Sequence, residues 1–365
     1  MYYLNQAILS QFPTIKKLNY LASCSQGLLP INASEAVTAY QEQLFYHGSN
    51  WELAMEMVEK ARGSFAKLIG AESEDIAVVS SVSHAISAIV TAFPESTVRD
   101  EIIYTDYDFP TVSDILAAQP QFTGNVHVIH AGKAGLTLEA FEKYINEKTL
   151  LTMIPHVHYT SGFKIDVQAV AEIAHQNGSF LFVDAYQSAG HCPINVKEME
   201  IDFLATGTRK YLLGIPGIAF LYINKKVIDQ LQPRITGWLG TGKKDARKFD
   251  SGTPSFISAY VAKASLDFIQ SIGVTNIASY LEDLGNFSIK YGQEKGLRIY
   301  GPAQMEQRSS LISFIHPQAP GIVKELREKH IVLTAKENII RLAPHVYNTK
   351  QDIMDAIDEF VLLTN

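Results

Sequence analysis

The sequence predicts an α/β fold, in which helices cover both faces of a mainly parallel, seven-stranded sheet and a smaller α+β domain follows. Two observations support this prediction. Short, continuous apolar runs alternate with helical patterns up to about residue 270, as is typical of buried parallel strands. Beyond that point the pattern changes to short strands between two helices. The length of 365 residues suits one large and one small domain better than a single core.

The predicted strands of the large sheet are short apolar runs. They cover residues 75–81, 101–106, 125–130, 150–155, 179–184, 201–207 and 217–223. Helical patterns between them cover residues 113–119, 137–145 and 166–178, and Gly178 is a normal end for the last of these helices. Strands that alternate with helices indicate crossover connections and hence parallel pairing.

The smaller domain is predicted from the last quarter of the chain. Its helices are expected over 277–296 and 349–363, and its strands over 297–301, 310–316, 331–335 and 339–344. The first thirty residues are expected to pack beside it. The predicted division is therefore an N-terminal segment of residues 1–30, a large domain of residues 31–265 and a small domain of residues 266–365.

Composition argues against several classes of partner. The formal net charge of −7 disfavours nucleic acid and anionic membrane surfaces. Cys24 and Cys192 lie far apart with no CxxC pair, which fits a reducing compartment and no structural zinc. The N-terminus has no basic region followed by an apolar run, and no window approaches the ~18 apolar residues of a membrane span. We expect a soluble, cytoplasmic protein.

One lysine stands in an unusual setting. Lys210, in TGTRKYLLGIPG (206–217), follows the apolar run IDFLA and has three glycines around it. A surface lysine needs no such setting. A lysine that is desolvated at a sheet edge has a lowered pKa, which makes its neutral amine available to attack a carbonyl carbon. Lys210 is therefore the predicted nucleophile.

Two more polar motifs follow predicted strands, where ligands of open parallel sheets collect. SSVSHAIS (80–87) opens a helix whose N–H groups, with Ser81 and Ser83, would seat a phosphate, although a plain helix N-cap is the alternative. VDAYQSAGHCP (183–193) puts Asp184 at a strand end, where it would need a cationic or N–H partner or would simply cap a helix. A phosphate seat, a carboxylate and a lysine match the phosphate, pyridinium nitrogen and aldehyde of pyridoxal phosphate.

In this order and spacing, the motifs resemble those of the class V aminotransferase group of pyridoxal-phosphate enzymes. This group includes cysteine desulfurases, kynureninases and isopenicillin-N epimerase-like proteins. The resemblance runs from LNYLASCSQGLLP (18–30) to IIRLAPHVYNTKQDI (339–353), nearly the whole chain. It implies the fold type I of pyridoxal-phosphate enzymes, the cofactor itself, an amino-acid substrate and a homodimer with active sites at its interface.

The resemblance gives roles to the residues expected around the cofactor ring. Lys210 would carry the cofactor as a Schiff base, and Asp184 would keep the pyridinium nitrogen protonated so that the ring acts as an electron sink. Gln187 matches the residue that hydrogen-bonds the ring hydroxyl in desulfurases. Phe109, in YDFPTVSD, matches the aromatic residue that stacks on the ring in kynureninase-like members, with a core aromatic as the alternative.

Phosphate contacts are implied in the same way. Ser83, with the backbone at Val82, matches the phosphate-binding turn. Thr253, in DSGTPS (250–255), matches a threonine that reaches the phosphate across a dimer interface, although it would also fit a helix N-cap. Arg209 replaces the histidine of desulfurases and the tyrosine of kynureninases just before the lysine, and is a candidate phosphate ligand.

Substrate contacts complete the predicted site. Arg341, in IIRLAPHVYNT, matches the arginine that clamps the substrate α-carboxylate, a task suited to a guanidinium, with a surface ion pair as the alternative. Tyr159 stands where desulfurases carry an asparagine near the ring oxygen, and His158 is a further candidate. Other side chains that would help to select the substrate are Cys24, Trp238 and His345.

The expected activity is the transformation of an amino acid through an external aldimine and a Cα carbanion, in the manner of class V aminotransferases. Residues 328–341 hold no cysteine where desulfurases carry their nucleophile, so persulfide chemistry is not expected. KYLLGIPG and DFPT favour the kynureninase and epimerase branch, which leaves a kynureninase- or C–S-lyase-like cleavage and an epimerase as alternatives. A catalytically silent member with a binding role is the alternative outside enzymes.

Two other motifs predict no site. GWLGTGKK (237–244) comes close to a P-loop, but Lys244 stands at the Ser/Thr position that Mg²⁺ needs. His156 and His158 share a face of an extended segment, but with no third ligand in view no metal site is expected.

Overall fold

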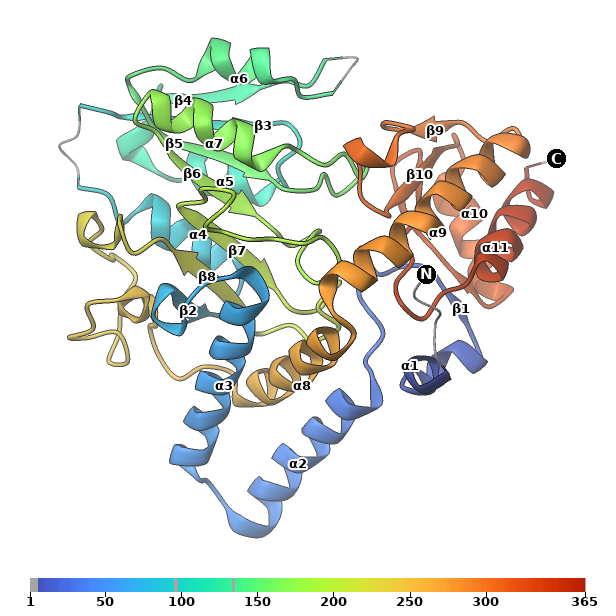
Figure 1. The fold of residues 1–365 in the computed structure, drawn as a ribbon, viewed down its shortest axis with the longest axis horizontal. Helices are drawn as coiled ribbons and strands as arrows, with labels where there is room; N and C mark the ends of the chain where they lie inside the picture. The colour runs from blue at the N-terminus through green and yellow to red at the C-terminus, as the bar shows by residue number, and fades with distance from the viewer. Residues whose placement is uncertain (1–5, 95–97, 133–134, 365) are drawn as a thin grey trace.

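The large sheet organises the molecule. The computed structural model describes residues 6–94, 98–132 and 135–364. The sheet has seven strands in the order β2-β8-β7-β6-β5-β3-β4 (Figure 1). β8 is antiparallel to both neighbours and all other pairs are parallel. The seven predicted strands are confirmed as β2 (Ile76–Val79), β3 (Glu101–Thr105), β4 (Val126–Ile129), β5 (Thr149–Pro155), β6 (Phe180–Asp184), β7 (Phe203–Gly207) and β8 (Ala219–Ile223).

Helices cover both faces of this sheet because its central strands are apolar on both sides, and every residue of β5, β7 and β8 is buried. One face packs against α4 (Val82–Val90) and α5 (Thr111–Ala117). The other packs against α3 (Trp51–Ile69), α6 (Leu138–Tyr144), α7 (Val167–Gln176) and α8 (Phe256–Ile272). α2 (Ile31–His47) packs along α8. The predicted helices between the strands are thus confirmed as α5, α6 and α7.

The smaller unit contains an antiparallel sheet in the order β12-β13-β10-β9. Its strands are β9 (Ile299–Tyr300), β10 (Ile312–Ile315), β12 (Thr334–Lys336) and β13 (Ile339–Leu342). Its helices are α9 (Val274–Glu294), α10 (Ala319–Glu328) and α11 (Lys350–Leu362). This confirms the small α+β domain predicted from the change of pattern.

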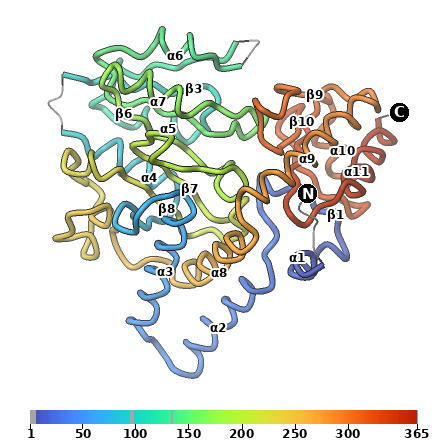
Figure 2. The backbone as a smooth tube through the Cα atoms, in the orientation of Figure 1, coloured from blue at the N-terminus to red at the C-terminus, as the bar shows by residue number. Residues whose placement is uncertain are grey.

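The N-terminal segment lies beside the smaller unit (Figure 2). After α1 (Gln6–Ser10), β1 (Asn19–Tyr20) pairs in parallel with β11 (Ile331–Val332). The predicted division after residue 265 falls inside α8, which continues to Ile272 and turns at Gly273 into α9. The three-part division remains a prediction.

Short 3₁₀ helices complete the described structure, at Pro13–Lys16, Ser73–Asp75, Pro120–Phe122, Ile228–Gln230, Ala246–Phe249 and Met305–Gln307. Within the described ranges, no helix has the length and apolar character needed to cross a bilayer. No group of three or more His, Cys, Asp or Glu side chains is arranged to hold a metal ion in that part of the chain.

A buried ion pair ties the sheet to the loop before α8. The guanidinium of Arg62, on α3, lies 2.7 Å from the carboxylate of Asp250, and both side chains are buried. Asp250 also accepts a hydrogen bond of 2.8 Å from the backbone N–H of Val78 on β2. Arg62 also pairs with the half-exposed Glu59 at 3.0 Å, so Asp250 is its buried partner and Glu59 its partly solvated one.

Replacing Asp250 with alanine should lower the free energy of unfolding by up to about 3–5 kcal/mol, because the guanidinium would lose its buried partner and keep only Glu59, whose side chain is 43% exposed. Denaturant and thermal unfolding measure the change. Asp283→Ala is the matched control, since the Asp283–Lys350 pair is 2.9 Å long but half exposed. Its loss should not exceed about 1 kcal/mol. Equal losses in the two variants would contradict the role assigned to Asp250.

Candidate active site

A cavity of about 230 Å³ lies where several strands of the large sheet end. β6 ends at Asp184, which is aligned with Ala205 of the neighbouring β7, and Lys210 follows β7. Parallel strands bring their carboxyl ends to one edge, which is why residues far apart in sequence meet there. Nine of the eleven predicted site residues line the cavity: Val82, Ser83, Phe109, Tyr159, Asp184, Gln187, Arg209, Lys210 and Arg341.

Lys210 is buried at this edge, with 8% of its surface exposed. Burial lowers the pKa of its amine to about 8, although the nearby Asp184 carboxylate acts in the opposite direction. The Nζ atom lies 4.2 Å from the ring centroid of Tyr186 and 6.0 Å from that of Phe109. A substantial fraction of this amine is therefore neutral near physiological pH.

Asp184 is the carboxylate of the site. Burial raises its pKa, while the backbone N–H of Tyr186, which donates to Oδ1 at 2.8 Å, and the charge of Lys210 favour the ionised form. No described residue donates a hydrogen bond to Oδ2. Its backbone carbonyl accepts from the N–H of His156 at 2.9 Å, which anchors the strand end. Oδ2 of Asp184 can therefore accept a hydrogen bond from a ligand.

The start of α4 forms the anionic-ligand end of the cavity. Ser81 is the N-cap of α4 and accepts a hydrogen bond of 3.0 Å from the backbone N–H of His84. For Ser81, the alternative prediction of a plain helix N-cap is therefore confirmed. Ser83 is not used as a cap, and its hydroxyl lies 3.0 Å from that of Thr111. Arg209, which is exposed, also lines the cavity, so two hydroxyls at this helix start and a guanidinium elsewhere on the wall are available to an anionic ligand.

Two polar groups from other parts of the chain have unused atoms. Gln187 donates through Nε2 to the carbonyl of Cys24 at 3.0 Å, whereas its buried Oε1 has no partner among the described residues. Arg341, on β13, donates through Nη1 to the carbonyl of Tyr159 at 2.9 Å, and its Nε has no described partner. β13 thus carries a cation from the smaller unit into the cavity.

His158 lies outside the cavity lining. The chain bends and turns after β5, and along it Val157 and Tyr159 line the cavity while His158 between them does not. Its ring stacks on Tyr107 at 4.0 Å, and burial lowers its pKa to about 3. His158 therefore supports the cavity wall from behind as a neutral ring.

Thr253 also lies outside the lining, on an exposed part of the segment that precedes α8. Of the other predicted selectors, Cys24 lines the cavity. His345 contacts the carbonyl of Tyr211 at 3.0 Å, and Trp238 packs against Trp51 with centroids 5.3 Å apart. Neither of these two residues lines the cavity.

Six lining residues were missed in the sequence: Ser25, Tyr107, Thr111, Pro155, Val157 and Tyr186. Tyr186 stands two residues after Asp184 and Tyr107 stands two before Phe109, so an aromatic residue next to a predicted site residue was the available signal. Which of these rings turns to the cavity depends on the local backbone path, which periodicity does not describe.

The unused groups fit pyridoxal phosphate. They are the Lys210 amine, the Asp184 Oδ2 and the Gln187 Oε1, with Arg341 at the other end. Unpartnered buried polar atoms are costly, so they indicate a ligand that supplies partners. An aldehyde, a ring N–H and a ring hydroxyl match the first three groups in chemical type, whereas pyridoxal phosphate has no carboxylate, so the guanidinium is left for a second ligand.

The chain is similar to known proteins along most of its length. A family model described as aminotransferase class-V matches residues 37–353. The chain is 44% identical over 363 residues to the uncharacterized aminotransferase YcbU of Bacillus subtilis (strain 168), covering 97% of this chain and 96% of that protein. It is 28% identical to a probable cysteine desulfurase of Halalkalibacterium halodurans, covering 95% and 93% of the two chains. It is also 28% identical to a kynureninase of Geobacillus thermodenitrificans, covering 93% and 86%.

A solved structure shows the same fold. The apo cysteine desulfurase of Thermococcus onnurineus NA1 superposes with a TM-score of 0.88 at 23% identity, covering 100% of this chain and 98% of that one.

Lys210 should make the stability of the ligand-free protein depend on pH. Its pKa is about 8 when folded and 10.5 in its ordinary state, so between these values the unfolded chain holds a proton that the folded chain has lost. Stability therefore rises with pH in this window, by about 1.4 kcal/mol for each unit between the two pKa values.

Melting temperatures across that window test this. The melting temperature of the wild type minus that of Lys210→Met should increase with pH, because the variant lacks the titrating amine. Lys226→Met, at an exposed lysine, should follow the wild type. A constant or falling difference would contradict the lowered pKa.

Proposed function

Because the chain belongs to the aminotransferase class-V family, we propose that it is a pyridoxal-phosphate enzyme acting at the Cα of an amino acid, with Lys210 and Asp184 as its central catalytic residues. The observation that carries this proposal is one cavity that holds a buried amine of lowered pKa beside a buried carboxylate at adjacent strand ends. Such a pair, together with family membership, points to imine chemistry.

The cofactor would be held by groups from several elements. Lys210 would bind its aldehyde carbon, Asp184 its ring nitrogen and Gln187 its ring hydroxyl. Phe109 offers an aromatic face on the same side of the cavity as Lys210. When bound, pyridoxal phosphate supplies an electron-withdrawing ring that stabilises negative charge at the substrate Cα.

The phosphate would lie at the start of α4. Ser83 and the backbone at Val82 would donate hydrogen bonds, and Arg209 would add positive charge. Thr253 does not line the cavity of its own chain, and we propose that it reaches the phosphate of a second copy in a homodimer. Its exposure in the single chain supports this arrangement.

The protein's own groups would then handle the proton at Cα. The Lys210 amine, whose pKa burial lowers to about 8 in the ligand-free protein, would accept that proton and return it. The ionised carboxylate of Asp184 would accept a hydrogen bond from the protonated ring nitrogen. It would thereby keep the proton on that nitrogen and the ring cationic.

Arg341 would bind the substrate α-carboxylate through its unused guanidinium atoms, with Tyr159 beside it. The segment around Cys24 covers the cavity and would exclude water. Tyr186, whose ring lies over the Lys210 amine, would restrict where that amine moves.

A kynureninase- or C–S-lyase-like cleavage is the second candidate. The aromatic Phe109 at the cavity and the absence of a cysteine between residues 328 and 341 favour it over a desulfurase reaction. Formation of a 2-oxo acid without an amino acceptor would distinguish cleavage from transamination. An epimerase remains a further alternative. A reducing compartment such as the cytoplasm is proposed from the two free cysteines, Cys24 and Cys192.

Borohydride reduction of the holoenzyme should attach the cofactor permanently to the peptide that contains Lys210, because reduction fixes the carbon–nitrogen link to that amine. Peptide mass spectrometry identifies the labelled residue. Lys226→Ala, at an exposed lysine, should be labelled as the wild type is, and Lys210→Ala should not. Labelling of another lysine in the wild type would refute the assignment.

Arg341→Gln should weaken binding of amino acids by about 10- to 100-fold, because a charge-assisted hydrogen-bonded contact to their carboxylate is lost. Titration of the cofactor absorption band measures the affinity. The corresponding amines, which lack the carboxylate, should bind the variant and the wild type equally. A similar loss for acids and amines would mean that Arg341 acts only on the structure of the cavity.

A further inference from the structure

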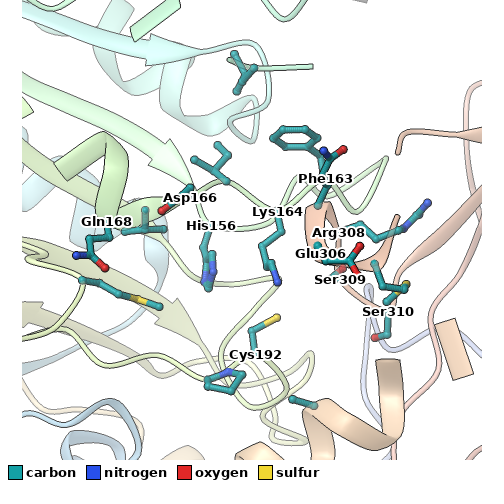
Figure 3. Close-up of a pocket in the computed structure, with 18 of the residues that line it drawn as sticks. His156, Phe163, Lys164, Asp166, Gln168, Cys192, Glu306, Arg308, Ser309 and Ser310 are labelled. Atoms are coloured by element: carbon teal, nitrogen blue, oxygen red, sulfur yellow. The ribbon is translucent and has the colours of Figure 1, made fainter. Parts of the chain in front are cut away.

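A second cavity, of about 930 Å³, lies between the large sheet and the smaller unit (Figure 3). One wall is the segment from residue 156 to residue 168, which leads from β5 into α7. Part of α9 and residues 305–310 form the opposite wall. The proposed function makes no use of this cavity.

The second cavity is distinct from the candidate active site. Val157 and Tyr159 line the active-site cavity, whereas His156 and Lys164 line the second one, so the segment after β5 divides the two spaces. Neither Lys210 nor any other predicted cofactor ligand lines the second cavity.

An uncompensated ammonium group faces this space. The side chains of His156 and Lys164 point toward Cys192, which reaches up from the opposite side (Figure 3). Lys164 makes no ion pair with the described part of the chain. Burial, and after it the charge of Lys164, lowers the pKa of His156 to about 4. Burial raises the pKa of the Cys192 thiol to about 12. Both groups are thus neutral at physiological pH and do not balance the lysine.

Arg308 adds to the positive potential. It is 1% exposed, and its Nη atoms donate only to backbone carbonyls, among them those of Ser161 and Leu311. Its Nε has no partner among the described residues. Figure 3 shows the guanidinium turned away from Lys164. Arg308 therefore acts through its charge rather than as a direct ligand.

Hydroxyl donors lie on the same wall. Ser310 is 3% exposed, and its buried hydroxyl has no partner among the residues described. Ser309 accepts from the N–H of Leu311 at 3.2 Å, which leaves its own proton free to donate. An ammonium on one wall and two hydroxyl donors on the opposite wall are the groups that an anionic oxygen pair could use in this cavity.

The rest of the cavity limits what the anion can be. Its deeper walls are apolar and include Leu136, Phe141, Leu281 and Met305. The exposed acidic side chains of Asp166, Glu282 and Glu306 also line it and would repel further negative charge. A single negative charge on an apolar body satisfies both conditions, whereas a phosphate dianion does not.

We propose that this cavity binds a small monocarboxylate with an apolar side chain, whose carboxylate is held by Lys164, Ser309 and Ser310. The carboxylate replaces the counter-ion that Lys164 lacks, and the apolar body covers the hydrophobic walls.

Isothermal titration calorimetry of the full-length protein, saturated with pyridoxal phosphate, tests the proposal with 4-methylpentanoate. This probe has no amine with which to react. It should bind at least about tenfold more tightly than 4-methylpentanamide, its uncharged analogue. Lys164→Met should remove that preference, while Lys324→Met, at an exposed lysine of α10, should keep it. Ala278→Trp, which fills the cavity from α9, should abolish binding while Lys164 stays in place.

Arg341→Gln separates the two cavities. If this variant loses the probe while Lys164→Met still binds it, the carboxylate sits in the active site and the proposal is wrong. Equal affinity for the acid and the amide in the wild type would overturn it as well. Melting temperatures confirm that each variant is folded. Binding of the probe does not require Lys210 to carry the cofactor, so failure of the proposed function would leave this result interpretable.

Discussion

Burial of an amine beside a carboxylate at one edge of a parallel sheet is the constraint on which the site depends. Lys210 and Asp184 each lose solvation there, and burial pushes both toward their neutral forms. Each charge partly opposes this effect on the other. The sheet tolerates the arrangement because the backbone groups around Asp184 are already paired, with the N–H of Tyr186 on its carboxylate and that of His156 on its carbonyl. The groups without a hydrogen-bond partner, the Oδ2 atom of Asp184 and the amine of Lys210, belong to residues that line the cavity.

Segments far from the sheet close this cavity. The N–H of Gly27 donates to the carbonyl of Arg209 at 2.7 Å, and a Cβ at Gly27 would lie 2.3 Å from the carbonyl oxygen of Lys210. Only glycine permits so close an approach of two backbones. Because β1 pairs with β11, the same segment also holds the smaller unit, whose β13 delivers Arg341. The segment around Gly27 therefore links the backbone at Lys210 to the smaller unit, and Arg341 is in place only when that unit is folded.

The segment after β5 separates the two cavities. Along it, Val157 and Tyr159 line the active-site cavity and His156 lines the second cavity. The two faces also differ in charge. On one face the Lys210 amine has Asp184 nearby, whereas on the other Lys164 has no buried carboxylate. The same local geometry thus supports a catalytic pair on one side and an anion receptor on the other.

The sequence by itself determined the seven strands, the helices between them and the motifs that follow strand ends, because apolar periodicity and helix-terminating residues are local properties. It also allowed eleven lining residues to be predicted, Ser81 and Cys24 among them, with the family resemblance supplying those outside the strand-end motifs. Only the tertiary structure decided the remainder. The backbone path after β5 turned His158 away from the active-site cavity, and the path after β6 brought Tyr186 into it. The packing of the large sheet against the smaller unit left Lys164 without a counter-ion in the second cavity. These outcomes depend on contacts between residues distant in the chain, which no local pattern encodes.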